Sequence, residues 1–121
     1  RVMASLSRDN GETWSAARDT VIPNPGSSLE VIVLRDGRWL IVHNDSTQSR
    51  DSLTVAISED EGKTWPLKRR LEPQSDGATS FSYPSVIQSA DGAVHITYTC
   101  KGPRGGRIRH GILQPGQLKT D

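Results

Sequence analysis

Few residues of this chain have side chains suited to chemistry. Arg50 lies in a polar, turn-prone segment over residues 44–52, and the planar fork of an arginine can give paired hydrogen bonds to a carboxylate. Tyr83 opens an expected strand, where a tyrosine most often packs its ring and leaves its hydroxyl in water. Glu30 begins another expected strand and could face a cavity. Taken alone, none of these residues predicts a reaction.

The histidines and the cysteine give no indication of a metal site. His43, His95 and His110 lack the spacing of metal ligands, so packing is the better interpretation. Cys100 is the single cysteine, which excludes an internal disulfide and a zinc site built from cysteines. No metal ion and no cofactor are therefore expected.

The composition argues against several function classes. The chain has 121 residues, of which 33% are hydrophobic and 5% aromatic, so a deep core is not expected. Its formal net charge of +1 leaves no electrostatic footprint for nucleic acid or a membrane as partner. Arg104, Arg107 and Arg109 form a basic patch of the kind that is usually solvated. No apolar run approaches the length of a transmembrane helix, and the first residues fit a strand better than a signal peptide.

One eight-residue pattern, S-x-D-x-G-x-T-W, occurs twice, at residues 7–14 and 58–65. In a tight hairpin the aspartate can accept hydrogen bonds from turn amides, and the glycine supplies a positive φ. The serine and threonine hydroxyls satisfy other turn groups, and the tryptophan covers the turn. We interpret both copies as structural. Their residues are Ser7, Asp9, Gly11, Thr13 and Trp14, and Ser58, Asp60, Gly62, Thr64 and Trp65.

The spacing of the repeats predicts an all-β fold. Ser58 follows Ser7 by 51 positions, and the Asp-Gly turn at 91–92 follows the one at 36–37 by 55, about the length of one four-stranded propeller blade. Expected strands cover residues 2–7, 14–22, 29–34, 39–43, 53–58, 65–71, 83–89, 94–99 and 107–113. Residues 101–106 are expected to form a loop, and the tail from residue 114 is expected to fray.

The repeated pattern resembles the Asp-box, or bacterial neuraminidase (BNR) repeat, of the sialidase superfamily. Residues 1–99 resemble the C-terminal portion of sialidase-type exo-glycosidases, most clearly over residues 81–88, 91–92 and 95–98. The resemblance implies an incomplete, roughly two-blade segment of a six-bladed β-propeller. Residues 1–22 would form an outer half-blade, 29–71 a complete blade, 81–113 a partial blade and 114–121 a tail. So few blades cannot bury their own faces, so we expect missing N-terminal blades or self-association.

The resemblance also implies roles for two residues. In sialidases an arginine triad holds the substrate carboxylate, a tyrosine activated by a glutamate is the nucleophile, and an aspartate is the acid/base. Arg50 would be the third arginine of that clamp. The tyrosine position falls on either Tyr83 or Phe81, and a phenylalanine could not serve as nucleophile. We prefer Tyr83, because the strand from Pro84 onward then needs no bulge.

The implied activity is hydrolysis of terminal sialic or similar acidic sugars, with a sialylated or other acidic glycan as partner. The glutamate, the aspartate and the first two arginines of the family would precede Arg1, so the chain alone is expected to be inactive. An alternative is a non-catalytic BNR-repeat module that binds a glycan or a protein, or assembles with itself. A propeller enzyme acting on a different sugar is a third possibility. The sequence indicates no compartment.

Overall fold

The computed structural model describes residues 1–75 and 77–118 and is all-β, as predicted. Alternating or fully apolar runs, interrupted by Gly, Pro and Asp turns, give nine strands within those residues. They are β1 (Met3–Ala4), β2 (Arg18–Asp19), β3 (Glu30–Val33), β4 (Trp39–His43), β5 (Leu53–Ser58), β6 (Leu67–Glu72), β7 (Ser80–Gln88), β8 (Val94–Gly102) and β9 (Gly105–Leu113). A 3-10 turn, η1, spans Pro115–Gln117. No described helix is long and apolar enough to cross a membrane.

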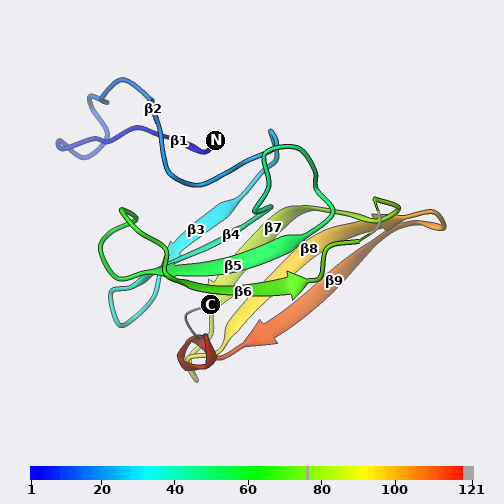
Figure 1. Cartoon of the computed structure of the whole chain (residues 1–121). Helices are drawn as coiled ribbons and strands as arrows, with labels where there is room; N and C mark the ends of the chain where they lie inside the picture. Colours follow the sequence, from blue (N-terminus) through cyan, green and yellow to red (C-terminus); the bar gives the residue numbers. More distant parts are fainter. Residues whose placement is uncertain (76, 119–121) are drawn as a thin grey trace.

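The strands form three antiparallel sheets, consistent with a partial propeller segment. The first sheet holds β1 and β2, the second has the order β3-β4-β5-β6, and the third has the order β7-β8-β9. The second and third sheets lie one against the other, and most of the chain before β3 extends as an arm (Figure 1), which Val2 and Ile22 join to Ile41 of β4. The first strands of the two larger sheets, β3 and β7, are neighbours across the stack.

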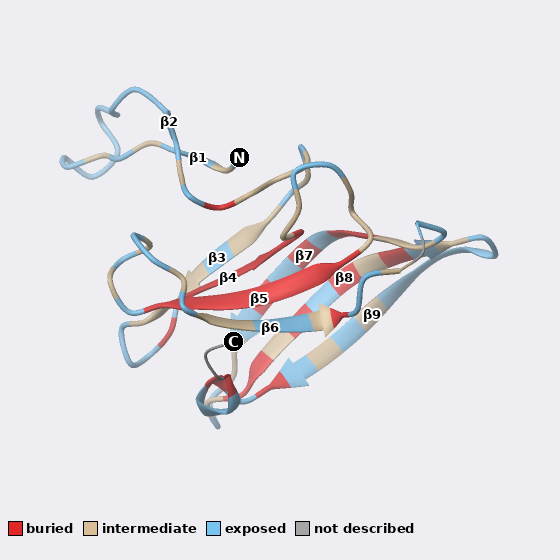
Figure 2. Cartoon of the chain, viewed as in Figure 1, coloured by how far each residue is buried: buried red, intermediate tan, exposed pale blue. Residues whose placement is uncertain are grey.

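The main hydrophobic core lies between the second and third sheets. Strands β4 and β5 are buried along nearly their whole length, whereas β9 is exposed over its first four residues and becomes buried only at Leu113 (Figure 2). Leu40, Val55 and Ile57 of the second sheet are fully inaccessible to solvent, as is Ile96 of the third. A smaller cluster around Ile41 covers the opposite face of the second sheet. The low apolar content therefore still supports a main core between the two sheets and a smaller cluster on the opposite face of the second.

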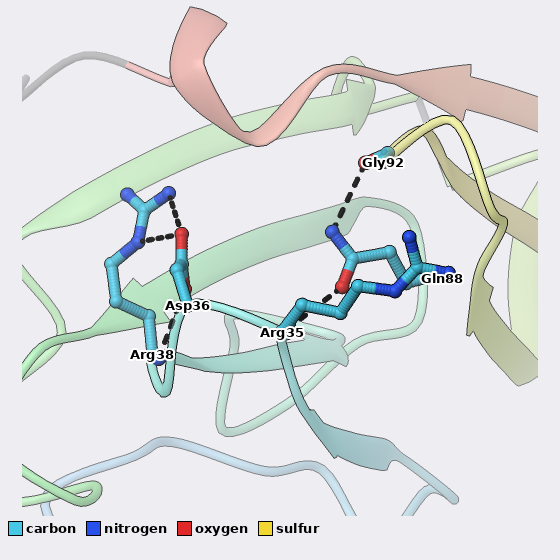
Figure 3. Close-up of polar contacts among 5 residues, drawn as sticks. All are labelled: Arg35, Asp36, Arg38, Gln88 and Gly92. Atoms are coloured by element: carbon cyan, nitrogen blue, oxygen red, sulfur yellow. Dashed lines mark hydrogen bonds and ion pairs between the residues drawn. The ribbon is translucent and has the colours of Figure 1, made fainter.

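The two Asp-Gly turns occupy equivalent places in the two larger sheets. Each closes with the same pair of backbone hydrogen bonds, between residues 34, 37 and 38 in one turn and between residues 89, 92 and 93 in the other. Side chains also join the turns (Figure 3): the Arg35 amide donates to Gln88 Oε1 at 2.9 Å, and Gln88 Nε2 donates to the Gly92 carbonyl at 3.1 Å. In the first turn, Arg38 forms an ion pair with Asp36 at 2.7 Å.

Two expectations about local structure were wrong. Residues 101–106 do not form a loop: β8 continues to Gly102 and β9 begins at Gly105, with only Pro103 and Arg104 between them. Gly105, directly after these two residues, has a φ of +106°, a backbone conformation that favours glycine. The tail does not fray over its described part, because Leu118 is 6% exposed and packs into the main core. Residues 119–121 lie outside the described residues.

Candidate functional site

The chain between β2 and β3 brings Arg50 and Tyr83 into one neighbourhood. Arg50, in the loop between β4 and β5, donates from Nη2 to the Gly26 carbonyl at 2.8 Å. Tyr83, in β7, donates its backbone N–H to Ser28 Oγ at 3.1 Å. The Phe81 amide in turn donates to the Arg50 carbonyl at 2.7 Å. Three segments that are remote in sequence therefore meet at one end of the second and third sheets.

Asn44 holds this meeting point together. Its side chain is fully buried and donates from Nδ2 to the carbonyls of Ser52, at 2.7 Å, and Phe81, at 3.1 Å. Its Oδ1 accepts a hydrogen bond from Ser27 Oγ at 2.6 Å. A buried amide with its partners satisfied fixes its neighbours firmly, because leaving any of them unmatched would cost free energy. Sequence reasoning missed Asn44, which follows β4 directly and could have been noted as a polar residue ending an apolar strand.

Tyr83 is exposed and has a strained backbone, whereas Phe81 is buried. Tyr83 is 67% exposed and has a φ of +52°, although it precedes a proline, where an extended conformation is favoured. Phe81 is 3% exposed and makes an edge-on ring contact with Tyr98. The expectation of an unbulged strand was wrong, because the β7–β8 register shifts between Ser82 and Ser85. The bulge turns the Tyr83 ring outward, and such strain persists only where surrounding structure enforces it.

The Arg50 guanidinium is only partly used by the protein. Its side chain is half-buried, and the Gly26 carbonyl is its one hydrogen-bond acceptor among the described residues. No carboxylate of those residues forms an ion pair with it. The remaining N–H donors are free to bind an anionic ligand. Within residues 1–75 and 77–118, however, no hydrogen bond joins Arg50 to Tyr83.

Glu30 has a structural task. Its Oε2 accepts a short hydrogen bond from the Val86 amide, so that the carboxylate of β3 joins the inner edge of β7. That edge has no strand partner on this side, and the carboxylate satisfies one of its free donors. The cavity-facing role considered for Glu30 is therefore not the one that its contacts support.

A second tyrosine lies beside a glutamate, at a place that sequence reasoning overlooked. The Tyr98 hydroxyl donates to Glu72 Oε1 at 2.7 Å, and Arg109 forms a short ion pair with the same oxygen. Burial, followed by the nearby Glu72 carboxylate, raises the pKa of Tyr98 to about 12. A phenol that is 6% exposed and resists ionisation is a poor nucleophile. This cluster therefore ties the outer parts of the two larger sheets together, and it removes Arg109 from the solvated patch expected with Arg104 and Arg107.

The aspartates of the repeated pattern are acceptors, not acids. Asp9 Oδ2 accepts from Thr13 Oγ1 at 2.5 Å, and Asp60 Oδ2 accepts from Thr64 Oγ1 at 2.6 Å. These side-chain bonds, followed by those from the threonine amides, lower the pKa of each aspartate to about 2. Ionised at neutral pH and fully engaged by their turns, neither can donate a proton in catalysis.

The histidines lie in different surroundings. His43 is buried, and this burial lowers its pKa. His95 and His110 lie side by side on the third sheet with stacked rings. No group of three or more His, Cys, Asp or Glu side chains in the described part of the chain is arranged to hold a metal ion.

The antiparallel sheets and the twice-repeated turn define a repeat protein of the all-β class. Comparison with known proteins gives the family: the model of the BNR repeat-like domain matches residues 1–96, and the chain belongs to this family. A sialidase of Paraclostridium sordellii is 28% identical over 111 residues, which are 88% of this chain and 26% of that protein. The chain thus spans about a quarter of the length of this relative. These likenesses establish a sialidase-related BNR-repeat protein.

Proposed function

We propose that this chain is the C-terminal portion of a sialidase-like exo-glycosidase that acts on terminal sialic or similar acidic sugars. The observation that carries the proposal is the common anchoring of Arg50 and Tyr83 on residues 26–28. In this role Arg50 holds the sugar carboxylate and Tyr83 attacks the anomeric carbon. The relationship to a sialidase over most of the chain supports the same assignment.

The chemistry requires these residue types. A sialic acid has a carboxylate on its anomeric carbon, so an attacking carboxylate would be repelled, whereas a phenol avoids the clash once a base has taken its proton. The exposed Tyr83 ring is accessible to a sugar, in contrast to the buried Phe81. The free N–H groups of Arg50 suit a planar carboxylate. Glu30 and Glu72 are engaged elsewhere, so neither is assigned as the activating base or as the acid/base.

Ligand-observed NMR tests the carboxylate clamp directly. The chain is expected to bind N-acetylneuraminic acid, and to bind its methyl ester at least about 10-fold more weakly, because esterification removes the charge that Arg50 holds. Arg50→Lys should weaken binding of the free acid, since an ammonium cannot form the bidentate pair. Arg69→Lys, on the exposed face of β6, is the matched control. If the acid and the ester bound equally well, and Arg50→Lys changed neither affinity, Arg50 would not be the residue that holds the carboxylate.

A fluorogenic aryl sialoside tests the completeness of the catalytic set. The chain alone should release no fluorophore above the rate of buffer, because only two of the required groups are assigned to it. Turnover by the chain that disappears in Tyr83→Phe would instead show that the set is complete.

The alternative function is a non-catalytic module that binds a glycan or a protein, or assembles with itself. The absence of a hydrogen bond between Arg50 and Tyr83 within the described residues favours it, as does the exposure of Ile87, Ile108 and Ile112 on the third sheet. Light scattering separates these cases: self-assembly requires a mass that rises with concentration, whereas a constant monomer mass argues against it.

A further inference from the structure

The outer face of the third sheet differs chemically from the equivalent face of the second. A constant shift of 55 positions relates the two ladders: Leu40 faces Ile57 in the second sheet, and His95 faces Ile112 in the third. By the same shift, His110 takes the place of Val55. Leu40 and Val55 are fully buried between the sheets. The third sheet therefore places two imidazoles where its counterpart packs aliphatic side chains.

These imidazoles face each other closely. His110 lies opposite Thr97 in the β8–β9 ladder, so His95 and His110 are diagonal neighbours on one face of the sheet. Their rings lie within 15° of parallel, with centroids 5.2 Å apart, and His95 Nδ1 is 3.0 Å from His110 Nε2. The β8–β9 ladder sets this approach, because His95, the second residue of β8, and His110, the sixth residue of β9, are both paired in it.

Packing does not account for this pair. His110 is exposed and His95 is half-buried, so no apolar core requires their rings. They line an open depression of about 340 Å³ together with Ser85, Ile87 and Thr97. The two ring nitrogens therefore lie in an open, largely apolar hollow that also has the hydroxyl-bearing residues Ser85 and Thr97 in its lining.

We propose that His95 Nδ1 and His110 Nε2 form a two-histidine site for a borderline-soft divalent metal ion such as Zn²⁺ or Cu²⁺. Imidazole is a preferred ligand of these ions. Two nitrogens bound tetrahedrally to zinc at about 2.0–2.1 Å are about 3.3 Å apart, close to the 3.0 Å separation between these atoms. To reach that geometry, each ring must turn so that its lone pair points at a common centre and no longer at the other nitrogen.

Binding requires one proton to move. In the metal-free pair, one of the facing nitrogens holds the proton of their hydrogen bond. When the ion binds, that proton moves to the far nitrogen of its own ring, and the two lone pairs then coordinate the ion. Water molecules complete the coordination, because no third His, Cys, Asp or Glu of the described residues joins the cluster.

The experiment uses the 121-residue chain purified without a histidine-containing tag. Competition with a chromophoric indicator gives the zinc affinity, and electron paramagnetic resonance of the Cu²⁺ form counts the coordinated nitrogens. The wild type should bind one ion and show two imidazole nitrogens. His95→Gln and His110→Gln should each weaken zinc binding at least about 10-fold and leave one imidazole nitrogen on copper.

Thr97→Val is the matched control, because it alters the same face and keeps both imidazoles. It should retain the wild-type affinity and spectrum. Circular dichroism confirms that the variants fold. The proposal is overturned if the wild type binds neither ion, or if the double variant His95→Gln/His110→Gln binds both ions as tightly as the wild type. Neither result bears on the acidic-sugar site, which is read out by the Arg50 variants.

Discussion

The two S-x-D-x-G-x-T-W turns have nearly the same internal hydrogen bonds and very different surroundings. In each, the serine hydroxyl accepts from the glycine amide, at 2.7 Å in the first turn and 2.8 Å in the second. In each, the indole N–H donates to the glycine carbonyl, at 3.0 and 3.1 Å. Yet Trp14 is 63% exposed, whereas Trp65 is half-buried and packs on the cluster around Ile41.

The difference shows what eight residues can and cannot specify. The turn closes on itself, so its geometry is the same on the two-stranded arm and on the complete second sheet. Burial, by contrast, depends on how many strands lie beside it. The first turn is therefore a self-contained loop, and the second belongs to the folded core.

The largest contrast is expected for alanine in place of the turn glycines. A Cβ on Gly62 would lie 3.2 Å from the Trp39 ring, whereas one on Gly11 would meet only Trp14, at 3.9 Å. Both glycines have positive φ. Gly62→Ala should lower the free energy of unfolding by about 2–4 kcal/mol and Gly11→Ala by about 1 kcal/mol. Urea unfolding followed by tryptophan fluorescence measures both, and equal losses would mean that the two turns have equivalent surroundings.

The tryptophans come next. Trp65→Ala removes a half-buried ring from the cluster around Ile41 and should cost about 2 kcal/mol, less than a fully buried tryptophan would. Trp14→Ala should cost less than about 0.5 kcal/mol, as for most exposed positions. Thermal unfolding by circular dichroism compares them. A Trp14→Ala loss as large as that of Trp65→Ala would show that the first turn itself packs on the core.

A smaller contrast is expected at the serines. Ser58 is fully buried and accepts from the Gly62 amide, so Ser58→Ala leaves a turn amide without its acceptor and should cost about 1–2 kcal/mol. Ser7 is more accessible to solvent, and water can replace its hydroxyl, so Ser7→Ala should cost at most about 0.5 kcal/mol. Hydrogen exchange of the Gly11 and Gly62 amides measures each loss locally. If Ser7→Ala lowered the protection of the Gly11 amide as much as Ser58→Ala lowers that of the Gly62 amide, the expected contrast would be wrong.

Between the two aspartates no contrast is expected. The pKa of each is lowered to about 2 by the threonine and serine of its own turn. Because the folded pKa lies below the ordinary value of 3.8, the stabilising effect is complete above about pH 4 and is lost as pH falls toward 2. Carboxyl-carbon NMR titration should give the same pKa at Asp9 and Asp60. Values differing by more than one unit would mean that burial affects the carboxylates.

The fold was largely predictable because its signals are local. The repeated turns, the Asp-Gly turns and the apolar runs gave the all-β class and most of the strands. The prediction failed at residues 101–106, where a loop was expected, because the ladder between β8 and β9 continues to the pair Gly102 and Gly105. The bulge at Tyr83 leaves no mark in the sequence, because the Ser28 hydroxyl, 55 positions away, contributes to holding it.

The site was predictable only in part. The resemblance to sialidases singled out Arg50 and Tyr83, whose assigned roles remain predictions. Asn44 and Glu72 were missed because their partners lie up to 37 positions away in the chain, and polar residues at strand ends have no periodicity that reveals a distant contact. The closeness of His95 and His110 depends on the β8–β9 register. The sequence did not predict this register, because a loop was expected between the two strands.

The shift of 55 positions between the second and third sheets means that one stretch of chain repeats the backbone pairing of another. Leu34 and Ser89 begin their turns at matching places, and Ile57 and Ile112 lie in matching places two strands later. Strands β3, β4 and β5 therefore share their register with the second half of β7, with β8 and with β9. Because backbone groups make this pairing, side chains at matching positions can differ without a change of register, as Leu40 and His95 illustrate.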